Sequence, residues 1–546
     1  MKTRFLPCRQ PELGSLRRWL RVLPVVVPVA VFPGCSDFLA SDGLAEGEGE
    51  EFGGEGSEGE GEDSNIGFGG AGDFGFVRAL LDANQVPQAD DIDDVGFFAE
   101  HQTTLPPADC GDRVCPHAML GAMANLVDGS DCTLLQVGLN SPLTIDPADR
   151  PPLTLAVAVD VSGSMNADDR IGFVRQGLRR LSNELDDDDQ LAIILYSSTA
   201  RVALPLTPVA GHRNDIADIA DTLVADGATN IFDGLDTAFE EVVAAFDTTR
   251  QHRVVLLSDG VATAGNSDPT AIRSMAATWV SEGVPLTTVG VGTDFDLELM
   301  RGLAEDGDGN FYFLDDATAV DEVFTEEIST FLMPVAFNVT LEIDLGADWT
   351  VRNVYGVRDF VVDDAGTGGR VTLNAVYLAG RTSADDTFEG EGRRGGGSAL
   401  LLEIMPTTLE TSLDPSQIGE VNVEFTAPGA AQPTIMATPS PQGSTALPAR
   451  GFFSSRIVEK SFVMLNLVVG MRSAATAFHA GQADEAASVL DNLVLAASDY
   501  EDSANNGDGD ADIRADITLL EQFRDVVIAQ GGTPDGENAD DPWPAD

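Results

Sequence analysis

Lysine is almost missing from this 546-residue chain, which contains Lys2, Lys460 and no other lysine. Lysine and arginine together number 31 against 90 aspartates and glutamates, so the formal net charge is -59. A chain this acidic repels phosphate backbones, which argues against nucleic acid as a partner. No Gly-Lys pair occurs either, and this excludes the phosphate-binding loop of the common ATPases.

The sequence is also poor in histidine and lacks the common catalytic motifs. Its 5 histidines are scattered, with no His-Glu-x-x-His pattern of a metalloprotease and no Gly-x-Ser-x-Gly nucleophile elbow. The stretch DGDGN at 306–310 begins like a calcium loop, but Phe311 and Ala317 stand where such a loop requires glycine and glutamate. These absences argue against a familiar hydrolase, so we expect a protein that is not an enzyme.

The N-terminus has the pattern of an export signal. Arg17, Arg18 and Arg21 directly precede the apolar run VLPVVVPVAVF at 22–32, which is too short to span a bilayer. The following FPGCSD resembles the lipobox of bacterial lipoproteins. That resemblance implies a lipoprotein signal peptide at 1–35, acylation of Cys35, and a membrane-anchored protein in the periplasm or at the cell surface. A plain secretory signal is the alternative.

Three further cysteines, Cys110, Cys115 and Cys132, follow the export signal. An oxidising compartment favours one disulfide and one remaining thiol among them, and the sequence leaves three pairings open. The stretch CGDRVCPH also permits a second interpretation, in which these cysteines and His117 bind zinc.

Between 153 and 332, apolar strand patterns alternate with amphipathic helix patterns. The expected strands lie at 153–160, 190–197, 253–260, 285–292 and 310–315, and the expected helices at 170–185, 230–246 and 268–283. Continuously apolar strands are typical of a parallel sheet covered on both faces. The pattern predicts a doubly wound, mostly parallel α/β domain at 151–332, in which ligands bind where the carboxyl ends of the strands meet the loops.

The other segments have different patterns. Residues 36–72 are rich in glycine and glutamate and predict a disordered tether, and two short helical patterns fall within 73–150. Short alternating strands with Gly-rich turns predict a β-sandwich at 333–450. Three amphipathic patterns predict a helical region at 451–530, and residues 531–546 predict a disordered tail.

Five polar side chains follow the expected strands or open an expected helix of the α/β domain: Asp160, Ser162, Ser164, Thr229 and Asp259. Their positions place them at one edge of the sheet. Mg²⁺ prefers oxygen ligands and keeps several waters, so the three hydroxyls can bind the ion directly while the two carboxylates hold its waters. Neutral ligands leave the ion electron-poor and open to a carboxylate from another protein.

These residues resemble the metal-ion-dependent adhesion site (MIDAS) of von Willebrand factor type A (VWA) domains. The Asp-x-Ser-x-Ser signature of that family stands as DVSGS at 160–164, its threonine as Thr229 and its second aspartate as Asp259. The resemblance implies a VWA domain that binds Mg²⁺, or Mn²⁺ in its place, and through it an Asp or Glu carboxylate of a protein partner.

The flanking regions resemble those of a bacterial exported VWA group. The stretch FVRALLDANQVP and the following VGFFAEH look like the segment before the VWA domain in that group, which implies an N-terminal VWA-associated segment at 73–150. We therefore expect a membrane-anchored, metal-dependent adhesion module of the cell envelope. The alternatives are a structural envelope protein with a silent metal site, or a subunit of an enzyme complex.

Overall fold

The structure is a computed structural model, and it describes residues 64–67, 74–101, 103, 105–127, 129–143, 151–314, 319–320, 323–324, 334–378, 399–408, 418–428, 430, 432–438, 452–503 and 509–534. The expected signal peptide with Cys35, most of the expected tether and most of the expected tail lie outside the described residues.

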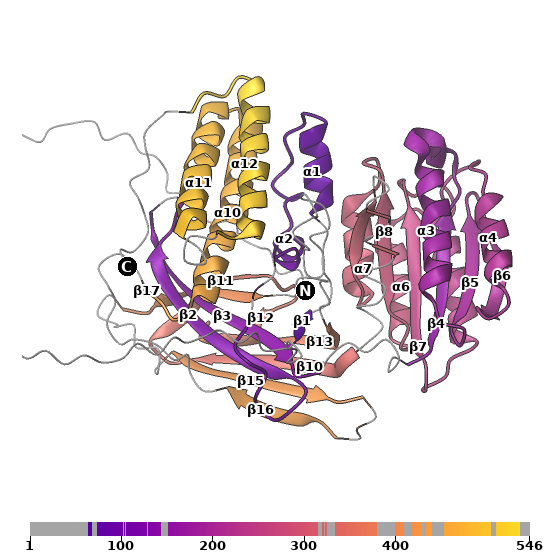
Figure 1. The fold of residues 1–546 in the computed structure, drawn as a ribbon, viewed down its shortest axis with the longest axis horizontal. Helices are drawn as coiled ribbons and strands as arrows, with labels where there is room; N and C mark the ends of the chain where they lie inside the picture. The colour runs from indigo at the N-terminus through magenta and orange to yellow at the C-terminus, as the bar shows by residue number, and fades with distance from the viewer. Residues whose placement is uncertain are drawn as a thin grey trace, which may run out of the picture. The chain divides into compact units, whose positions relative to one another are not determined.

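The segment expected to be an α/β domain contains a six-stranded sheet in the order β6-β5-β4-β7-β8-β9 (Figure 1). All neighbouring strands are parallel except β5 and β6, which are antiparallel. The strands are β4 Leu153–Asp160, β5 Gln190–Tyr196, β6 Ala200–Pro208, β7 Gln251–Ser258, β8 Leu286–Val291 and β9 Phe311–Leu314. The central strand β4 is buried along its whole length, as its apolar sequence predicts.

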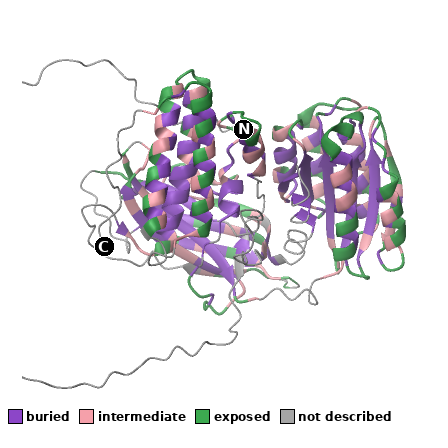
Figure 2. Ribbon diagram, turned by 45° about the horizontal axis from the view of Figure 1, so that its top comes forward, coloured by how far each residue is buried: buried purple, intermediate pink, exposed green. Residues whose placement is uncertain are grey.

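Helices cover both faces of this sheet. Helices α3 (Arg170–Glu184) and α4 (Arg213–Asp221) pack on one face, while α5 (Ile231–Val243), α6 (Pro269–Val280) and α7 (Leu297–Asp306) pack on the other. Figure 2 shows buried strands between helices whose outer sides are exposed. The prediction of a doubly wound, mostly parallel α/β fold is confirmed.

The second sheet system has eleven strands, in the order β11-β14-β3-β1-β13-β10-β15-β16, with β2, β12 and β17 paired off this path. Its strands are β1 Ser64–Gly67, β2 Cys115–Ala124, β3 Asp131–Ser141, β10 Pro334–Leu345, β11 Trp349–Tyr355, β12 Val361–Val362, β13 Gly368–Leu378, β14 Leu400–Pro406, β15 Gly419–Thr426, β16 Thr434–Thr438 and β17 Phe452–Phe453. A shared apolar core contains Val137 of β3 and Leu341 of β10, so two sheets pack face to face and β1 bridges their edges. This is the predicted β-sandwich.

The sandwich includes more of the chain than the predicted segment 333–450. Strands β2 and β3 come from 115–141, where no strand was expected, and β1 comes from 64–67, within the expected disordered tether. The α/β domain is therefore inserted between strands β3 and β10 of one sandwich. The prediction of a tether was wrong for 64–67, because backbone pairing with β3 and β13 orders a segment whose side chains alone predict disorder.

Three long helices lie side by side against the sandwich: α10 (Arg456–His479), α11 (Ala483–Ser503) and α12 (Ala511–Ala529) (Figure 1). The same apolar core includes residues of α1 (Gly75–Asp82) and α2 (Asp94–Ala99). Within the described residues, α10 has the length and apolarity to cross a membrane, but 72% of its apolar window is buried in the protein. It is the helix of this layer that packs against β2 and β3, and the predicted three helices are confirmed.

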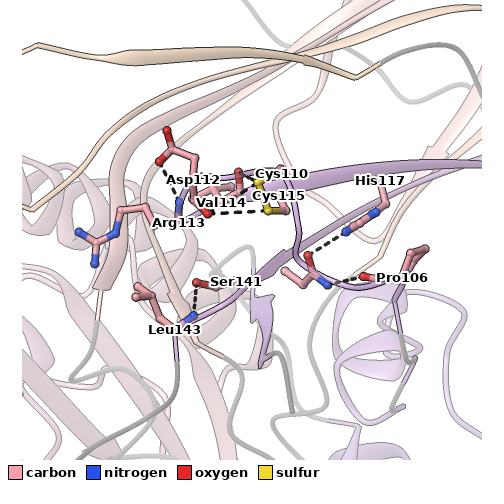
Figure 3. The surroundings of a disulfide bond; sticks show 10 residues. Pro106, Cys110, Asp112, Arg113, Val114, Cys115, His117, Ser141 and Leu143 are labelled. Carbon is pink, nitrogen blue, oxygen red and sulfur yellow. Dashed lines mark hydrogen bonds between the residues drawn. A yellow bond between two sulfur atoms is a disulfide. The ribbon is translucent and has the colours of Figure 1, made fainter. Parts of the chain in front are cut away.

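Figure 3 shows a disulfide between Cys110 and Cys115 at the start of β2. Cys132 on β3 is buried and is not part of a disulfide. This is one of the three pairings that the sequence left open. The zinc interpretation does not hold, because sulfurs joined in a disulfide are not thiolate ligands. His117 instead contacts Asn140 Oδ1 through its Nε2, at 2.8 Å.

Candidate metal centre

The two aspartates of the expected metal site lie at the ends of adjacent parallel strands. Asp160 is the last residue of β4, and Asp259 directly follows β7, whose Leu257 lies beside Val159. Both carboxylates are fully buried. Both strands place these charges at the carboxyl-terminal edge of the sheet, where the loops begin and where ligands bind in this architecture.

The loop after β4 carries the two serines and is tied to a second loop. After Ser162 comes a short 3₁₀ segment, Gly163–Asp169, that contains Ser164. Gly163 N donates to Gly227 O at 3.0 Å, and Asp226 N donates to Val161 O at 2.8 Å. These two backbone hydrogen bonds hold the serine loop against the loop that leads to Thr229.

Thr229 precedes α5, which Asn230 caps by accepting a hydrogen bond from Asp233 N at 3.2 Å. The backbone of Thr229 is fixed by Thr263, whose Oγ1 accepts from Thr229 N at 3.0 Å and whose N donates to Thr229 O at 2.8 Å. The hydroxyl of Thr229 makes no hydrogen bond to the described residues. It is held in place with its oxygen available to a ligand.

A chain of hydrogen bonds connects four of the five expected residues. Ser162 Oγ lies 2.9 Å from Ser164 Oγ, and Ser164 Oγ donates to Asp259 Oδ1 at 2.8 Å. Asp160 Oδ1 accepts from Ser162 N at 2.8 Å. The structure thus brings these four residues together.

Gly260 shows where Thr229 stands relative to this cluster. A Cβ atom at Gly260 would lie 3.6 Å from Ser164 Oγ and 3.6 Å from Thr229 Oγ1. The two hydroxyl oxygens therefore flank one small space that is left clear by the lack of a side chain. Hydroxyls around such a space, with carboxylates behind them, suit a hard cation such as Mg²⁺. The residues present fit the expected metal.

Burial raises the pKa of Asp160 to about 6, and the neighbouring Asp259 carboxylate adds to the rise. Hydrogen bonds from Ser162 N and from Ser258 Oγ, which donates to Asp160 Oδ2 at 2.8 Å, oppose it. Two buried carboxylates this close repel each other, and a cation between them relieves that repulsion.

Sequence reasoning missed three residues of this centre: Ser258, Gly260 and Arg170. Ser258 and Gly260 stand on either side of Asp259, so their positions alone could have suggested a role. Arg170 Nη1 donates to Asp259 Oδ2 at 3.0 Å, and its Nη2 donates to Asp294 Oδ2 at 2.5 Å. Nothing in the motif predicts Asp294, which lies 124 residues further along the chain.

The other sequence candidates form no site. Asp306 ends α7, and residues 307–310 form the turn before β9, as the departures from a calcium loop predict. In the part of the chain that the structure describes, no three His, Cys, Asp or Glu side chains gather as metal ligands. The expected centre is of another kind, because three of its five residues contribute hydroxyls.

Comparison with known proteins agrees with this geometry. Residues 154–326 match the von Willebrand factor type A domain family. The chain is 29% identical over 293 residues to the uncharacterized protein YfbK of Escherichia coli (strain K12), covering 52% of this chain and 49% of YfbK. It is 27% identical over 203 residues to inter-alpha-trypsin inhibitor heavy chain H3 of Rattus norvegicus, covering 35% of this chain and 22% of that protein.

The chain thus spans about half the length of one relative and less of the other. Among solved structures, a von Willebrand factor type A protein from Catenulispora acidiphila matches 76% of this chain and 96% of its own, at 14% identity and a TM-score of 0.47. Residues 154–326 form a VWA domain, a kind of domain that binds a divalent metal ion at its MIDAS and mediates contacts between proteins.

Proposed function

We propose that the protein is a membrane-anchored binding module of the bacterial cell envelope, which holds a carboxylate of a protein partner through Mg²⁺ at the MIDAS. In this proposal Ser162, Ser164 and Thr229 provide the direct ligands. Asp160 and Asp259 hold the ion's waters and balance its charge. The bound ion supplies a positive, open coordination position for the partner's Asp or Glu side chain.

One observation carries the proposal: the space beside Gly260 is flanked by Ser164 Oγ and Thr229 Oγ1, each 3.6 Å from the position of an added Cβ. These hydroxyls come from separate loops, and Ser164 Oγ also donates a hydrogen bond to the buried carboxylate of Asp259. The hydroxyls are neutral, so an ion bound by them retains enough charge to attract an external carboxylate.

The surface near the centre offers further contacts to a partner. Val261, two residues after Asp259, is 51% exposed, and Val224, on the loop that leads to Thr229, is 74% exposed. One ion-mediated contact supports an affinity of about 1 mM. Tighter binding of a partner must therefore draw its additional free energy from apolar contacts of this kind.

Metal binding is the direct test. Titration calorimetry of the wild-type protein with Mg²⁺ should show a single site, and Asp160→Ala should weaken that binding about 100-fold, because a residue that positions the ion's waters is lost. Asp221→Ala is the matched control, since Asp221 is paired with Arg179 on the far side of α3. Partner capture from envelope extracts should then require Mg²⁺ and fail with EDTA or with Asp160→Ala.

Equal capture by the wild-type protein, by Asp160→Ala and in EDTA would contradict the proposal. The structural alternative, an envelope protein with a silent metal site, would then take its place. Turnover assays on purified protein address the other alternative, a subunit of an enzyme complex.

The anchoring part of the proposal rests on the lipobox-like FPGCSD. Acylation of Cys35 would hold the protein at the membrane, and the Cys110–Cys115 disulfide supports an oxidising compartment. Cys35→Ser should release soluble protein or leave the precursor unprocessed, as cell fractionation and mass spectrometry would show. An intact, unmodified Cys35 in the mature wild-type protein would rule out the lipid anchor.

A further inference from the structure

Arg170 occupies an unusual position beside the metal centre. It is the first residue of α3, where the partial positive charge of the helix end disfavours a basic side chain, and the first turn of the helix has no acidic residue to offset this. Its side chain is nevertheless only 4% exposed. Helix stability does not explain this arginine, and another contact must compensate its burial.

The fold provides a slot for its guanidinium group. Gly292 has φ +72, and a Cβ added there would lie 2.5 Å from Arg170 Nε and 2.9 Å from Cζ. Asp168 and Asp169, the two residues before Arg170, have the positive φ values 46 and 57. Non-glycine residues in this conformation are strained, and such strain gathers at functional sites. The loop before Arg170 therefore adopts a strained backbone, and the loop with Gly292 needs a glycine to enclose this side chain.

The guanidinium group links a buried carboxylate to an exposed one. It donates to Asp259 Oδ2 at 3.0 Å and to Asp294 Oδ2 at 2.5 Å, and Asp168 Oδ2 lies 3.9 Å away. The side chain of Asp259 is fully buried, while those of Asp294 and Asp168 are 72% and 90% exposed. With Ser164 Oγ donating to Asp259 Oδ1, both oxygens of this carboxylate already accept a hydrogen bond.

We propose that Arg170 is a positioning residue that acts as a built-in counter-ion of the MIDAS. It keeps the buried Asp259 paired and in place in the metal-free protein. The positive charge of Arg170 repels a metal ion at the site and so lowers the protein's own affinity for that ion. A bound ion therefore depends more on an external carboxylate. Asp294 sets the strength of this effect, because its charge offsets that of Arg170. The inference rests on the proposed metal site and adds the residue that tunes it.

The proposal predicts opposite effects for the two members of one ion pair. Arg170→Gln removes a positive charge near the ion, so the affinity for Mg²⁺ should rise about tenfold. Asp294→Asn leaves Arg170 less neutralised, so the affinity should fall about threefold. If the pair only maintained the shape of the loop, both substitutions would weaken binding. The sign of the change therefore separates charge tuning from structural support.

The experiment is titration calorimetry of the full chain with Mg²⁺ alone, together with thermal unfolding in EDTA and in Mg²⁺. In EDTA, Arg170→Gln should unfold at a lower temperature than the wild-type protein, because Asp259 is left buried and unpaired. Adding Mg²⁺ should raise the unfolding temperature of Arg170→Gln by more than it raises that of the wild-type protein, because tighter binding stabilises the folded state more. Arg170→Lys keeps the charge and should retain wild-type affinity. Arg179→Gln, on the same helix, is the control.

Asp294→Asn alters an exposed side chain and provides the second measurement if Arg170→Gln does not fold. A gain of affinity with Asp294→Asn, or a loss with folded Arg170→Gln, overturns the role of Arg170 and leaves the metal site standing. A wild-type protein that binds neither Mg²⁺ nor Mn²⁺ overturns the proposed function and this inference together.

Discussion

The metal centre of the VWA domain and the sandwich-and-helix region bury polar groups in different ways. In the VWA domain, the polar groups of the metal centre come from loops at one edge of the sheet and contact each other there. In the other region they join segments far apart in the chain. His101 Nε2 contacts Asp516 Oδ2 at 2.6 Å across 415 residues, and Lys460 pairs with both Asp510 and Asp512.

The first arrangement suits the binding of a ligand, and the second holds distant segments of the chain together. Polar groups that converge on a space beside a glycine are arranged for a ligand. Pairs that connect the segment after α2 to α12, or α10 to the start of α12, instead fix which segments pack together. Substitutions in the two regions should therefore change different measurements.

The largest effect is expected in the helical layer. Phe462 of α10 is fully buried, and its ring packs 5.5 Å from that of Phe453. Phe462→Ala should lower the free energy of unfolding by about 3–5 kcal/mol, because it leaves a cavity in the core. Urea unfolding would measure the loss, with the 40% exposed Ile528→Ala of α12 as control. At low temperature the affinity for Mg²⁺ should stay unchanged. A matching loss of metal binding would mean that the two regions are not independent.

A smaller effect, on the affinity for Mg²⁺ and not on stability, is expected at the metal centre. Gly260→Ala places a methyl group at an ordinary contact distance from the hydroxyls of Ser164 and Thr229, so the fold should tolerate it. The same methyl group fills the space that a cation needs, and the affinity for Mg²⁺ should fall about tenfold, or roughly 1.4 kcal/mol. Calorimetry measures the affinity, and thermal unfolding in EDTA checks that stability is retained. Unchanged Mg²⁺ affinity would place the ion elsewhere.

The smallest effect concerns a histidine of the VWA domain that is remote from the metal loops. His252 stacks on Phe246 with ring centres 4.3 Å apart, and its Nε2 accepts a hydrogen bond from Asp247 N at 3.1 Å. Burial lowers the pKa of His252, and the charge of Arg250 lowers it further. Below about pH 6.5 the unfolded chain binds this proton more readily than the folded protein.

The stability that neutral His252 contributes is therefore present above about pH 6.5 and is lost as the pH falls through the pKa of the folded state. His252→Gln should make the free energy of unfolding fall less steeply between pH 7 and pH 5. Urea unfolding across that range compares the two proteins. Parallel pH profiles would show that His252 titrates alike in the folded and unfolded states.

The VWA domain could be predicted from the sequence because short, continuous stretches of the chain identify its strands and its motif residues. Each parallel strand is a short apolar run, and Asp160 and Asp259 directly follow two of them, so the order of elements alone places the motif at one edge of the sheet. Strand β6 was missed because much of it is exposed and lacks the apolar run that marked the others.

The sandwich was predicted only in part, since its strands come from both sides of the inserted domain. Residues 115–141 are apolar enough for strands, but nothing in them indicates pairing with residues near 400, as Leu135 and Leu402 do. Arg170 and Asp294 were missed for the same reason. Their contact depends on how α3 and the loop after β8 meet in space, and neither residue belongs to a motif.

The insertion of the VWA domain between β3 and β10 has a mechanical consequence. In the proposed function, a partner that pulled on the metal ion would transmit its load to the sandwich through two covalent connections. Strand β3 is hydrogen-bonded to β2 and β14, and β10 is hydrogen-bonded to β13 and β15. Tension at the adhesion site is thus divided between two long strands, each bonded along both edges, and neither can be drawn out of its sheet without breaking two rows of hydrogen bonds.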